Sequence, residues 1–247
     1  MSIENILRER QIKYLCHFTR LENLESILTH GLIPRSNLYN AEFNPNPRLR
    51  VSGLFPNPRL RVSGLFPNPR LRVSGLFNDT VRADNHPDAT CLSISFPNSR
   101  MFSALRHECI NGNWIEKQGI YWAVIVLKSD VLLDKKCAFY PTNAANNCVR
   151  HLPTENFQRV DALNALFEGA DEEREYLLPK DPTDVQAEVL VFDKIEQRYI
   201  VSCVFDSDDL KDEFINKFPN YKFESNPNRW GVFNDRFYAR KNGFKDY

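Results

Sequence analysis

Residues 186–192 read Gln186-Ala187-Glu188-Val189-Leu190-Val191-Phe192, an apolar stretch with one carboxylate near its start. Its branched and aromatic residues favour a β-strand. A glutamate beside such residues is costly to bury unless it has partners or lies at an edge. The preceding residues 177–184 contain two prolines and predict a loop. A loop followed by such a strand is typical of a carboxylate presented at the rim of a cleft. The alternative is a solvent-facing glutamate on a half-exposed strand.

The whole chain has the composition of an ordinary globular protein. Its 247 residues allow one large domain or two small ones. Lys plus Arg and Asp plus Glu both number 32, so the global charge indicates no particular partner. The six cysteines form no Cys-x-x-Cys pair, which predicts reduced thiols in a cytoplasmic protein and no zinc site. We expect no signal peptide. The sequence contains no run of about 18 apolar residues, so we also expect no membrane-spanning helix.

Alternation and helical spacing along the chain predict a mixed α+β protein rather than a regular βαβ repeat. The helix expected at residues 21–30 is followed by Gly31 as a C-cap. The apolar run at residues 121–127 predicts a central strand. Further strands are expected at residues 14–19, 91–96, 186–192, 199–205 and 230–238, and further helices at residues 2–12, 101–107, 155–169 and 207–218. The absence of Gly-x-Gly-x-x-Gly and Walker motifs argues against a Rossmann or P-loop nucleotide site.

An 11-residue unit, Pro-Asn-Pro-Arg-Leu-Arg-Val-Ser-Gly-Leu-Phe, occurs three times in succession, at residues 45–55, 56–66 and 67–77. Identical copies indicate recent duplication at a site that tolerates insertion, as surface loops do. Each copy adds two arginines and no acid, so the insert carries six positive charges. Such a segment suits contact with a phosphate backbone. The alternative is an expanded loop without a dedicated role.

Two polar side chains share one face of the first expected strand. His17 and Thr19 alternate there with Cys16 and Phe18, and polar groups on a buried strand need partners or a ligand. A lone histidine of this kind is more often structural, so a structural role and a binding role both remain open for His17.

Several segments, taken in order, resemble the DarT family of NAD-dependent nucleic-acid ADP-ribosyltransferases. They are His17-Phe18-Thr19, residues 22–32, Asn78-Asp79 with Arg82, His86-Pro87-Asp88, residues 93–98 with Met101-Phe102, residues 141–145 and residues 186–191. The resemblance covers nearly the whole chain and predicts a single domain over residues 1–247. The repeat insert at residues 45–77 is the main departure from the family pattern, and it affects the loop that should lead to Arg82.

This resemblance implies an ADP-ribosyltransferase fold, a split mixed β-sheet with flanking helices whose cleft holds NAD as a substrate. It assigns catalysis to Glu188, which would stabilise an oxocarbenium-like transition state, and to Arg82, which would hold the pyrophosphate. The residues expected to bind NAD are His17, Phe18, Thr19, Leu28, Ser95, Asn98 and Met101. The residues expected to contact nucleic acid are Asn143, Lys180, Asp181, Thr183 and Asp184. No metal is expected.

The resemblance also implies a toxin-like enzyme in a toxin–antitoxin or phage-defence system, with a cognate antitoxin as partner. Single-stranded DNA is the favoured substrate, and messenger RNA is the next alternative. Modification of a protein side chain would need the same catalytic core with a different acceptor pocket. A catalytically inactive nucleic-acid-binding module is the alternative from another class. The joint presence of His17, Arg82 and Glu188 argues against it.

Overall fold

The structure is a computed structural model that describes residues 2–37, 84, 86–110, 112–117, 121–228 and 230–246. The repeat insert at residues 45–77 and the candidate catalytic Arg82 lie outside these described residues. Within them, no helix has both the length and the apolar character that crossing a membrane requires.

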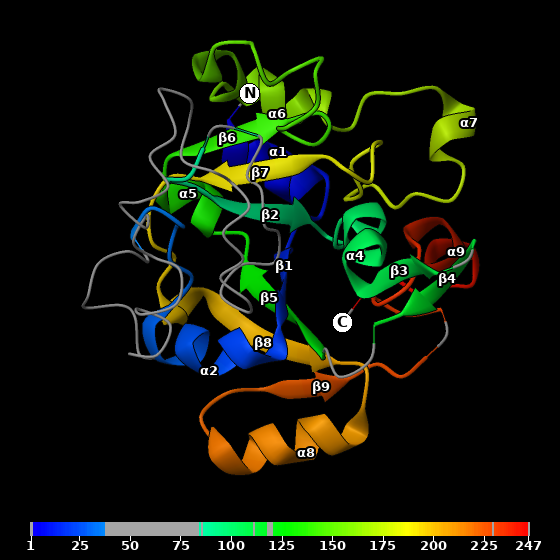
Figure 1. Cartoon of the computed structure of the whole chain (residues 1–247). Helices are drawn as coiled ribbons and strands as arrows, with labels where there is room; N and C mark the ends of the chain where they lie inside the picture. Colours follow the sequence, from blue (N-terminus) through cyan, green and yellow to red (C-terminus); the bar gives the residue numbers. More distant parts are fainter. Residues whose placement is uncertain are drawn as a thin grey trace, which may run out of the picture.

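A mixed β-sheet forms the centre of the molecule (Figure 1). Within the described residues it has seven strands in the order β6-β7-β2-β1-β5-β8-β9. Neighbouring strands run antiparallel, except for the parallel pair β8 and β9. The bounds are β1 Tyr14–Arg20, β2 Thr90–Ile94, β5 Trp122–Lys128, β6 Cys137–Tyr140, β7 Glu188–Val191, β8 Ile200–Phe205 and β9 Phe223–Ser225. The expected α+β class is confirmed.

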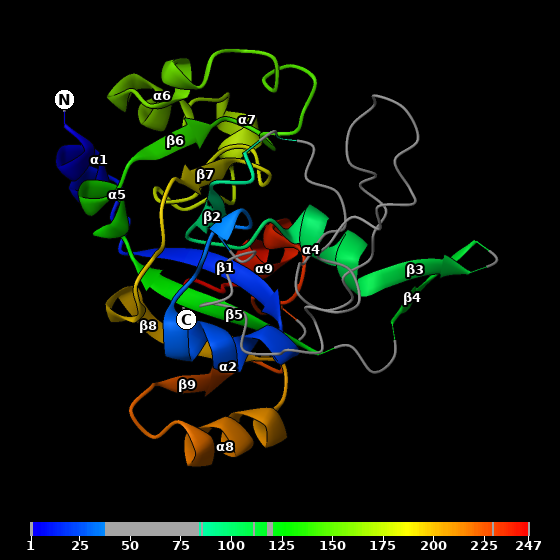
Figure 2. The ribbon, with the colours of Figure 1, turned by 60° about the vertical axis from the view of Figure 1, so that its left-hand side comes forward.

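A short hairpin stands apart from this sheet. It consists of β3 His107–Ile110 and β4 Asn113–Glu116, which pair antiparallel. Figure 2 shows it projecting from the end of α4 Ser99–Arg106. Trp114 on β4 is 69% exposed. The sequence analysis did not predict this hairpin, because it has too few residues to show a clear alternation.

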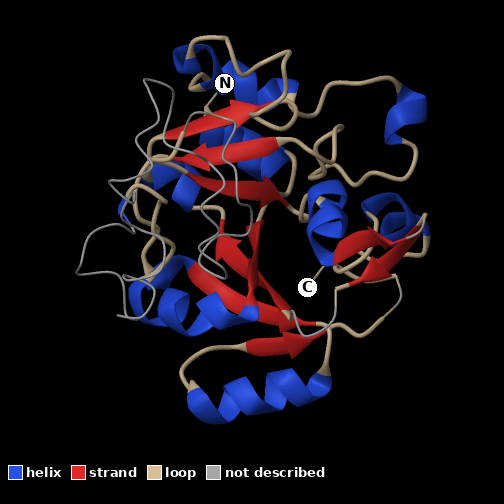
Figure 3. Ribbon diagram, viewed as in Figure 1, coloured by secondary structure: helices blue, strands red, loops and turns tan. Residues whose placement is uncertain are grey.

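Helices lie against the central sheet (Figure 3), and apolar cores cover both of its faces. Leu15 and Ile125 belong to one core, which is packed against α1, α2, α5, α6 and α8. Phe18 and Val124 belong to a second core, which includes Phe102 of α4, and a third core forms around Tyr140 and Leu190. The remaining bounds are α1 Ile3–Glu9, α2 Leu21–His30, α5 Val131–Asp134, η3 Thr154–Phe157, α6 Val160–Ala165, α7 Asp171–Arg174, η4 Gln197–Tyr199, α8 Asp208–Lys217 and α9 Arg236–Lys241. Residues of β5 are therefore buried on both faces, as the sequence predicts for a central strand.

The C-terminal segment differs from its sequence prediction. Residues 230–238 do not form a strand; the chain turns and then forms α9. Asp235 caps this helix, because its carboxylate accepts a hydrogen bond from the backbone N–H of Phe237 at 2.9 Å. Arg236 and Arg240, one turn apart, are both buried. Their partners lie far away in the sequence, so the local aromatic pattern misled the prediction.

The helix expected at residues 155–169 is shorter than predicted. The chain forms the 3₁₀-helix η3 and then α6, and extended backbone at Arg159 separates the two. The apolar residues of 155–165 therefore belong to two separate helices, although their spacing is that of one. The helices expected at residues 21–30 and 207–218 agree with α2 and α8, and Gly31 ends α2 with a φ of 86°. That left-handed conformation favours glycine.

Candidate functional site

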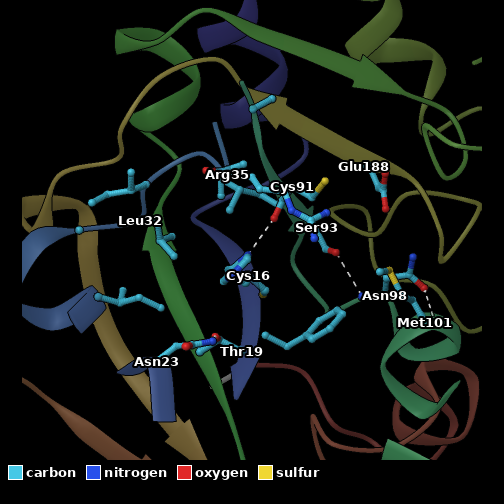
Figure 4. Close-up of a pocket in the computed structure, with 18 of the residues that line it drawn as sticks. Cys16, Thr19, Asn23, Leu32, Arg35, Cys91, Ser93, Asn98, Met101 and Glu188 are labelled. Carbon is cyan, nitrogen blue, oxygen red and sulfur yellow. Dashed lines mark hydrogen bonds between the residues drawn. The ribbon is translucent and has the colours of Figure 1, made fainter. Parts of the chain in front are cut away.

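The central sheet is split between β1 and β2, and the split forms the candidate site. These strands pair only through Leu15 with Ile94 and Cys16 with Ser93. Beyond Cys16, β1 continues beside β5, whereas β2 continues beside β7. A pocket lies where the two strands separate (Figure 4). It is lined by residues of β1, α2 and the loop after it, by β2 and the residue before it, by the start of α4 and by Glu188.

Glu188 lies at the first position of β7 and is only 5% exposed. Its carboxylate accepts two hydrogen bonds. The Nδ2 of Asn143 lies 2.8 Å from Oε1, and the backbone nitrogen of Ala144 lies 3.0 Å from Oε2. Both donors belong to the loop after β6, whose Tyr140 pairs with Glu188. These bonds compensate for burial and orient the carboxylate. The alternative of a solvent-facing glutamate is therefore wrong.

The β1 side of the pocket carries the two polar residues that the sequence places on one face. The Nδ1 of His17 lies 2.9 Å from the carbonyl oxygen of Cys91 on β2. A carbonyl can only accept, so Nδ1 carries the proton in this contact. Thr19 is buried, and its hydroxyl oxygen accepts a hydrogen bond from Nδ2 of Asn23 at 3.4 Å. His17 thus bridges the split in the sheet, while Thr19 is tied to α2.

Asn98 occupies the side of the pocket at the start of α4. Its Oδ1 accepts a hydrogen bond from the backbone nitrogen of Met101 at 3.0 Å, and its own backbone nitrogen donates to Oγ of Ser93 at 3.1 Å. Its Nδ2 is buried and has no hydrogen-bond partner among the described residues, and the same holds for Oγ1 of Thr90. Buried polar atoms rarely lack partners. Both residues line the pocket, so a polar ligand such as NAD that displaced the groups covering these atoms would find hydrogen-bonding partners there.

Not all predicted NAD-binding residues line this pocket. His17, Phe18, Thr19, Asn98 and Met101 do. Leu28 instead belongs to the core beneath α2 and is only 2% exposed, so the structure does not support a contact from its side chain. Ser95 lies just beyond β2 with a φ of 61°, and its hydroxyl donates to Oδ1 of Asp181.

Asp181 has a different environment from the one expected of a nucleic-acid contact. It is fully buried, and Arg240 donates to both of its carboxylate oxygens at 2.7 Å. Burial opposes its ionisation, but the hydrogen bonds and charge of Arg240 outweigh that effect and lower the pKa of Asp181. A carboxylate held in this way cannot reach a nucleic acid, so its predicted contact is corrected to a structural one.

The other residues predicted to contact nucleic acid also have hydrogen-bond or ion-pair partners within the protein. Lys180 forms an ion pair with Asp246, and its side chain is only 13% exposed. The hydroxyl of Thr183 accepts a hydrogen bond from Nη1 of Arg174 at 2.7 Å. The carboxylate of Asp184 accepts one from the backbone nitrogen of Gln186 at 2.8 Å. Asn143 holds Glu188, as described above. Their contacts with nucleic acid therefore stay predictions.

The structure also adds pocket residues that the sequence analysis missed. Asn23, Thr90, Cys91 and Arg35 line the pocket. Arg35 matters because a cation there could approach a pyrophosphate. It follows Pro34 in a loop without a motif, so nothing in the sequence singled it out. Among the described residues, no three His, Cys, Asp or Glu side chains are grouped to hold a metal ion.

A split mixed sheet with a buried glutamate at its cleft has the form expected of an ADP-ribosyltransferase. A family model described as "ssDNA thymidine ADP-ribosyltransferase, DarT" matches residues 96–238, more than half of the chain. The chain therefore belongs to the DarT family, as its sequence motifs suggested. No curated protein matches the sequence.

Two solved structures show the same fold. "Thermosipho africanus DarTG in complex with ADP-ribose" has a TM-score of 0.51 and 15% identity, over 92% of this chain and 57% of that chain. The present chain thus spans little more than half the length of that relative. "Thermus sp. 2.9 DarT in complex with ADP-ribosylated ssDNA" has a TM-score of 0.50 and 15% identity, over 87% of this chain and 95% of that chain. At this identity the likeness concerns the fold.

Proposed function

We propose that this chain transfers ADP-ribose from NAD to a thymidine base in single-stranded DNA, the activity named for its family. One observation carries the proposal. Glu188 is buried at the split in the sheet, its carboxylate is oriented by two N–H donors, and it lines the same pocket as His17 and Asn98. A pocket built in this way provides both a polar binding surface and a positioned carboxylate.

The carboxylate suits the chemistry of the transfer. The bond between nicotinamide and ribose breaks, nicotinamide leaves with the bonding electrons as a neutral molecule, and a bond forms between the ribose and the base. Positive charge develops on the ribose as in glycoside hydrolysis, and a carboxylate beside it stabilises that charge. The same carboxylate can accept the proton that the base loses. Glu188 is the only carboxylate among the described residues that line the pocket.

The remaining pocket residues would hold the donor. Nδ2 of Asn98, which has no partner among the described residues, would donate to an oxygen of NAD, and His17 would contact a ribose hydroxyl. Arg35 lines the pocket and could balance the charge of the pyrophosphate, the role that the resemblance gives to Arg82. These assignments divide the site into a donor pocket and a carboxylate at its edge.

The proposed biological role is that of a cytoplasmic toxin in a toxin–antitoxin or phage-defence system. It rests on the family and on the likeness to the Thermosipho africanus DarTG chain. A cognate antitoxin would remove the modification or block the pocket. Expression of the chain alone should then arrest growth, and coexpression with the antitoxin should restore it. Harmless accumulation of active enzyme would contradict this role.

Incubation with NAD that is labelled in its adenosine half tests the proposed activity. Single-stranded DNA, RNA and protein are offered in parallel, and nicotinamide release is measured in each reaction. We expect label on DNA only, accompanied by nicotinamide. Label on RNA or protein would identify a different acceptor for the same catalytic core. Absence of nicotinamide release in every reaction would leave a binding module instead of an enzyme.

A further inference from the structure

We propose that Asp181 and Arg240 form a positioning pair that, together with Arg236, fixes the loop at residues 178–187 for transfer to the acceptor. The proposal rests on the proposed function and deepens it. In this view the pair controls attack by the base on ADP-ribose, and the pocket that binds NAD does not depend on it.

The carboxylate of Asp181 is saturated with protein donors. Nε and Nη2 of Arg240 each lie 2.7 Å from one of its oxygens, the two-pronged geometry that a guanidinium favours. The backbone nitrogen of Leu178 donates to Oδ2 at 2.9 Å, and the hydroxyl of Ser95 donates to Oδ1. The two ionised side chains are 0% and 1% exposed. The pair is therefore shielded from solvent and holds both ends of the turn at residues 178–181.

Two further arginines hold the backbone of the loop. Nη1 and Nη2 of Arg236 donate to the carbonyl oxygens of Pro182 and Thr183 at 2.8 and 2.9 Å. Nη2 of Arg174 donates to the carbonyl oxygen of Asp181 at 3.2 Å. Three successive carbonyls thus accept from guanidinium groups, which satisfies backbone that no strand or helix would pair. Burial lowers the pKa of Arg236 to about 10, so this side chain stays cationic at neutral pH.

Asp181, Arg236 and Arg240, which we call the cluster, join two chain segments that both reach the pocket. Through Ser95 the cluster holds the segment after β2, which leads to Asn98. The backbone nitrogen of Arg236 also donates to Oγ of Ser99, the first residue of α4, at 3.3 Å. On the other side, the loop leads directly into Glu188. The cluster is therefore placed to set how these two segments lie relative to each other.

The side chains of Asp181, Arg236 and Arg240 do not line the donor pocket. Its lining comes from β1, α2, the loop after α2, β2 with Ala89 before it and the start of α4, and Glu188 is the only contribution from residues 178–188. Asn143 and Ala144 hold the Glu188 carboxylate independently of the loop. Loss of the contacts by which the cluster holds the loop, which we call the clamp, should therefore leave NAD binding and attack by water nearly intact. Transfer to a base should suffer, because attack depends steeply on the position of the acceptor.

Substitution of the two arginines of α9 tests the proposal. Arg240→Gln removes the charge and the bidentate contact with Asp181, whereas Arg240→Lys keeps the charge only. Arg236→Lys keeps the charge but loses one of the two hydrogen bonds to the loop. Transfer to single-stranded DNA and NAD hydrolysis without acceptor are measured side by side. We expect Arg240→Gln to lower the transfer-to-hydrolysis ratio about 10- to 100-fold. Arg240→Lys should recover part of the loss, and KM for NAD should stay unchanged.

A matched control separates positioning from general stability. Lys135 and Glu196 form another ion pair, with an N–O distance of 2.8 Å and side chains that are 11% and 38% exposed, near the opposite end of β7. Lys135→Gln should lower stability without changing the ratio. Equal losses of transfer and hydrolysis in the Arg240 variants, as in a merely destabilised protein, would overturn the proposal. If Arg240→Gln does not fold, the two lysine variants still give the ratio.

Hydrogen exchange gives a readout that does not need activity. Arg240→Lys and Arg236→Lys should speed amide exchange in residues 177–187 while β1, β5 and β8 keep their protection. Unchanged exchange in that loop would contradict the clamp even if the wild-type protein proved inactive. An inactive wild type with a loosened loop in the variants would instead reject the proposed function and the control of transfer, and keep only the structural clamp.

Discussion

The donor pocket and the loop before Glu188 use their polar groups in opposite ways. In the pocket, Nδ2 of Asn98 and Oγ1 of Thr90 are buried without a partner among the described residues. In the loop, the side chains of Lys180, Asp181, Thr183 and Asp184 are all bound within the protein. The pocket is therefore prepared for a polar ligand, whereas the loop is prepared to keep one shape. We infer that the donor side acts through direct contacts and the acceptor side through position.

Glu188→Gln should have the largest effect, because it removes the charge while keeping nearly the same shape. Loss of a positioned acid–base group typically costs about 10²- to 10⁴-fold in rate, and we expect that loss in transfer with little change in NAD affinity. Turnover and NAD binding are measured separately. Glu224→Gln, in a partly exposed glutamate of β9 that pairs with Lys222, is the control. Near-normal turnover of Glu188→Gln would remove Glu188 from the mechanism.

Asn98→Asp should have the next largest effect and tests the donor side of the comparison. Aspartate can still cap α4, but it replaces the unpartnered Nδ2 donor with an oxygen. Loss of one net hydrogen bond corresponds to about 2- to 10-fold in affinity, so KM for NAD should rise by at least that factor. Thr90→Val, which removes Oγ1, another pocket-residue atom without a partner in the described part of the chain, should give a smaller rise. An unchanged KM in both variants would show that NAD binds elsewhere.

Shortening the arginine-rich insert tests a second way of holding the acceptor. Deleting residues 56–77 removes two copies and four arginines. If they contact phosphates, affinity for single-stranded DNA should fall, and the slope of log affinity against log salt should become shallower by about 0.7 per lost contact. The effect should be similar for different DNA sequences, and NAD hydrolysis should barely change. An unchanged slope would favour an expanded loop without a role.

The smallest expected effect concerns the thiol reactivity of two cysteines in the apolar core that contains Leu15 and Ile125. Burial raises the pKa of Cys137 and of Cys203 to about 12. Both should stay protonated and unreactive towards a thiol reagent at pH 8, while the exposed Cys109 and Cys148 react. The folded-state pKa of each thiol exceeds the usual value of 9.0, so below pH 9 both thiols are protonated whether the protein is folded or unfolded. As the pH rises from 9 towards 12, the thiols ionise in the unfolded state only, and the free energy of unfolding falls. Rapid labelling of Cys203 in the native protein would contradict this burial.

The sequence predicted those features that depend on local patterns. Alternation and short apolar runs identified β1, β2, β5, β7 and β8, and helical spacing with Gly31 identified α2. The family motifs placed His17, Asn98 and Glu188 in one site, and the structure brings all three to one pocket. These predictions succeeded because each strand shows its burial in its own residues, and because the motif residues occur in the order that the family pattern requires.

The features that were missed depend on partners far apart in the chain. Arg240 and Asp181 are separated by 59 residues, and neither alone indicates an ion pair. Without that pair, the aromatic residues 230–238 favoured a strand over α9, and Asp181 looked like an exposed loop residue. Arg35 has no motif around it. Long-range contacts of this kind cannot be read from spacing, because many other arginines are equally available.

The most direct test of the central claim is a count of products in one reaction. The wild-type protein is incubated with labelled NAD and an oligonucleotide that contains a single thymidine, beside a matched oligonucleotide without thymidine. We expect one nicotinamide released for each labelled base on the first oligonucleotide, beyond the hydrolysis seen without DNA, and no label on the second. Label on the thymidine-free DNA, or nicotinamide release that never yields labelled DNA, would contradict an enzyme that passes ADP-ribose from this pocket to thymidine.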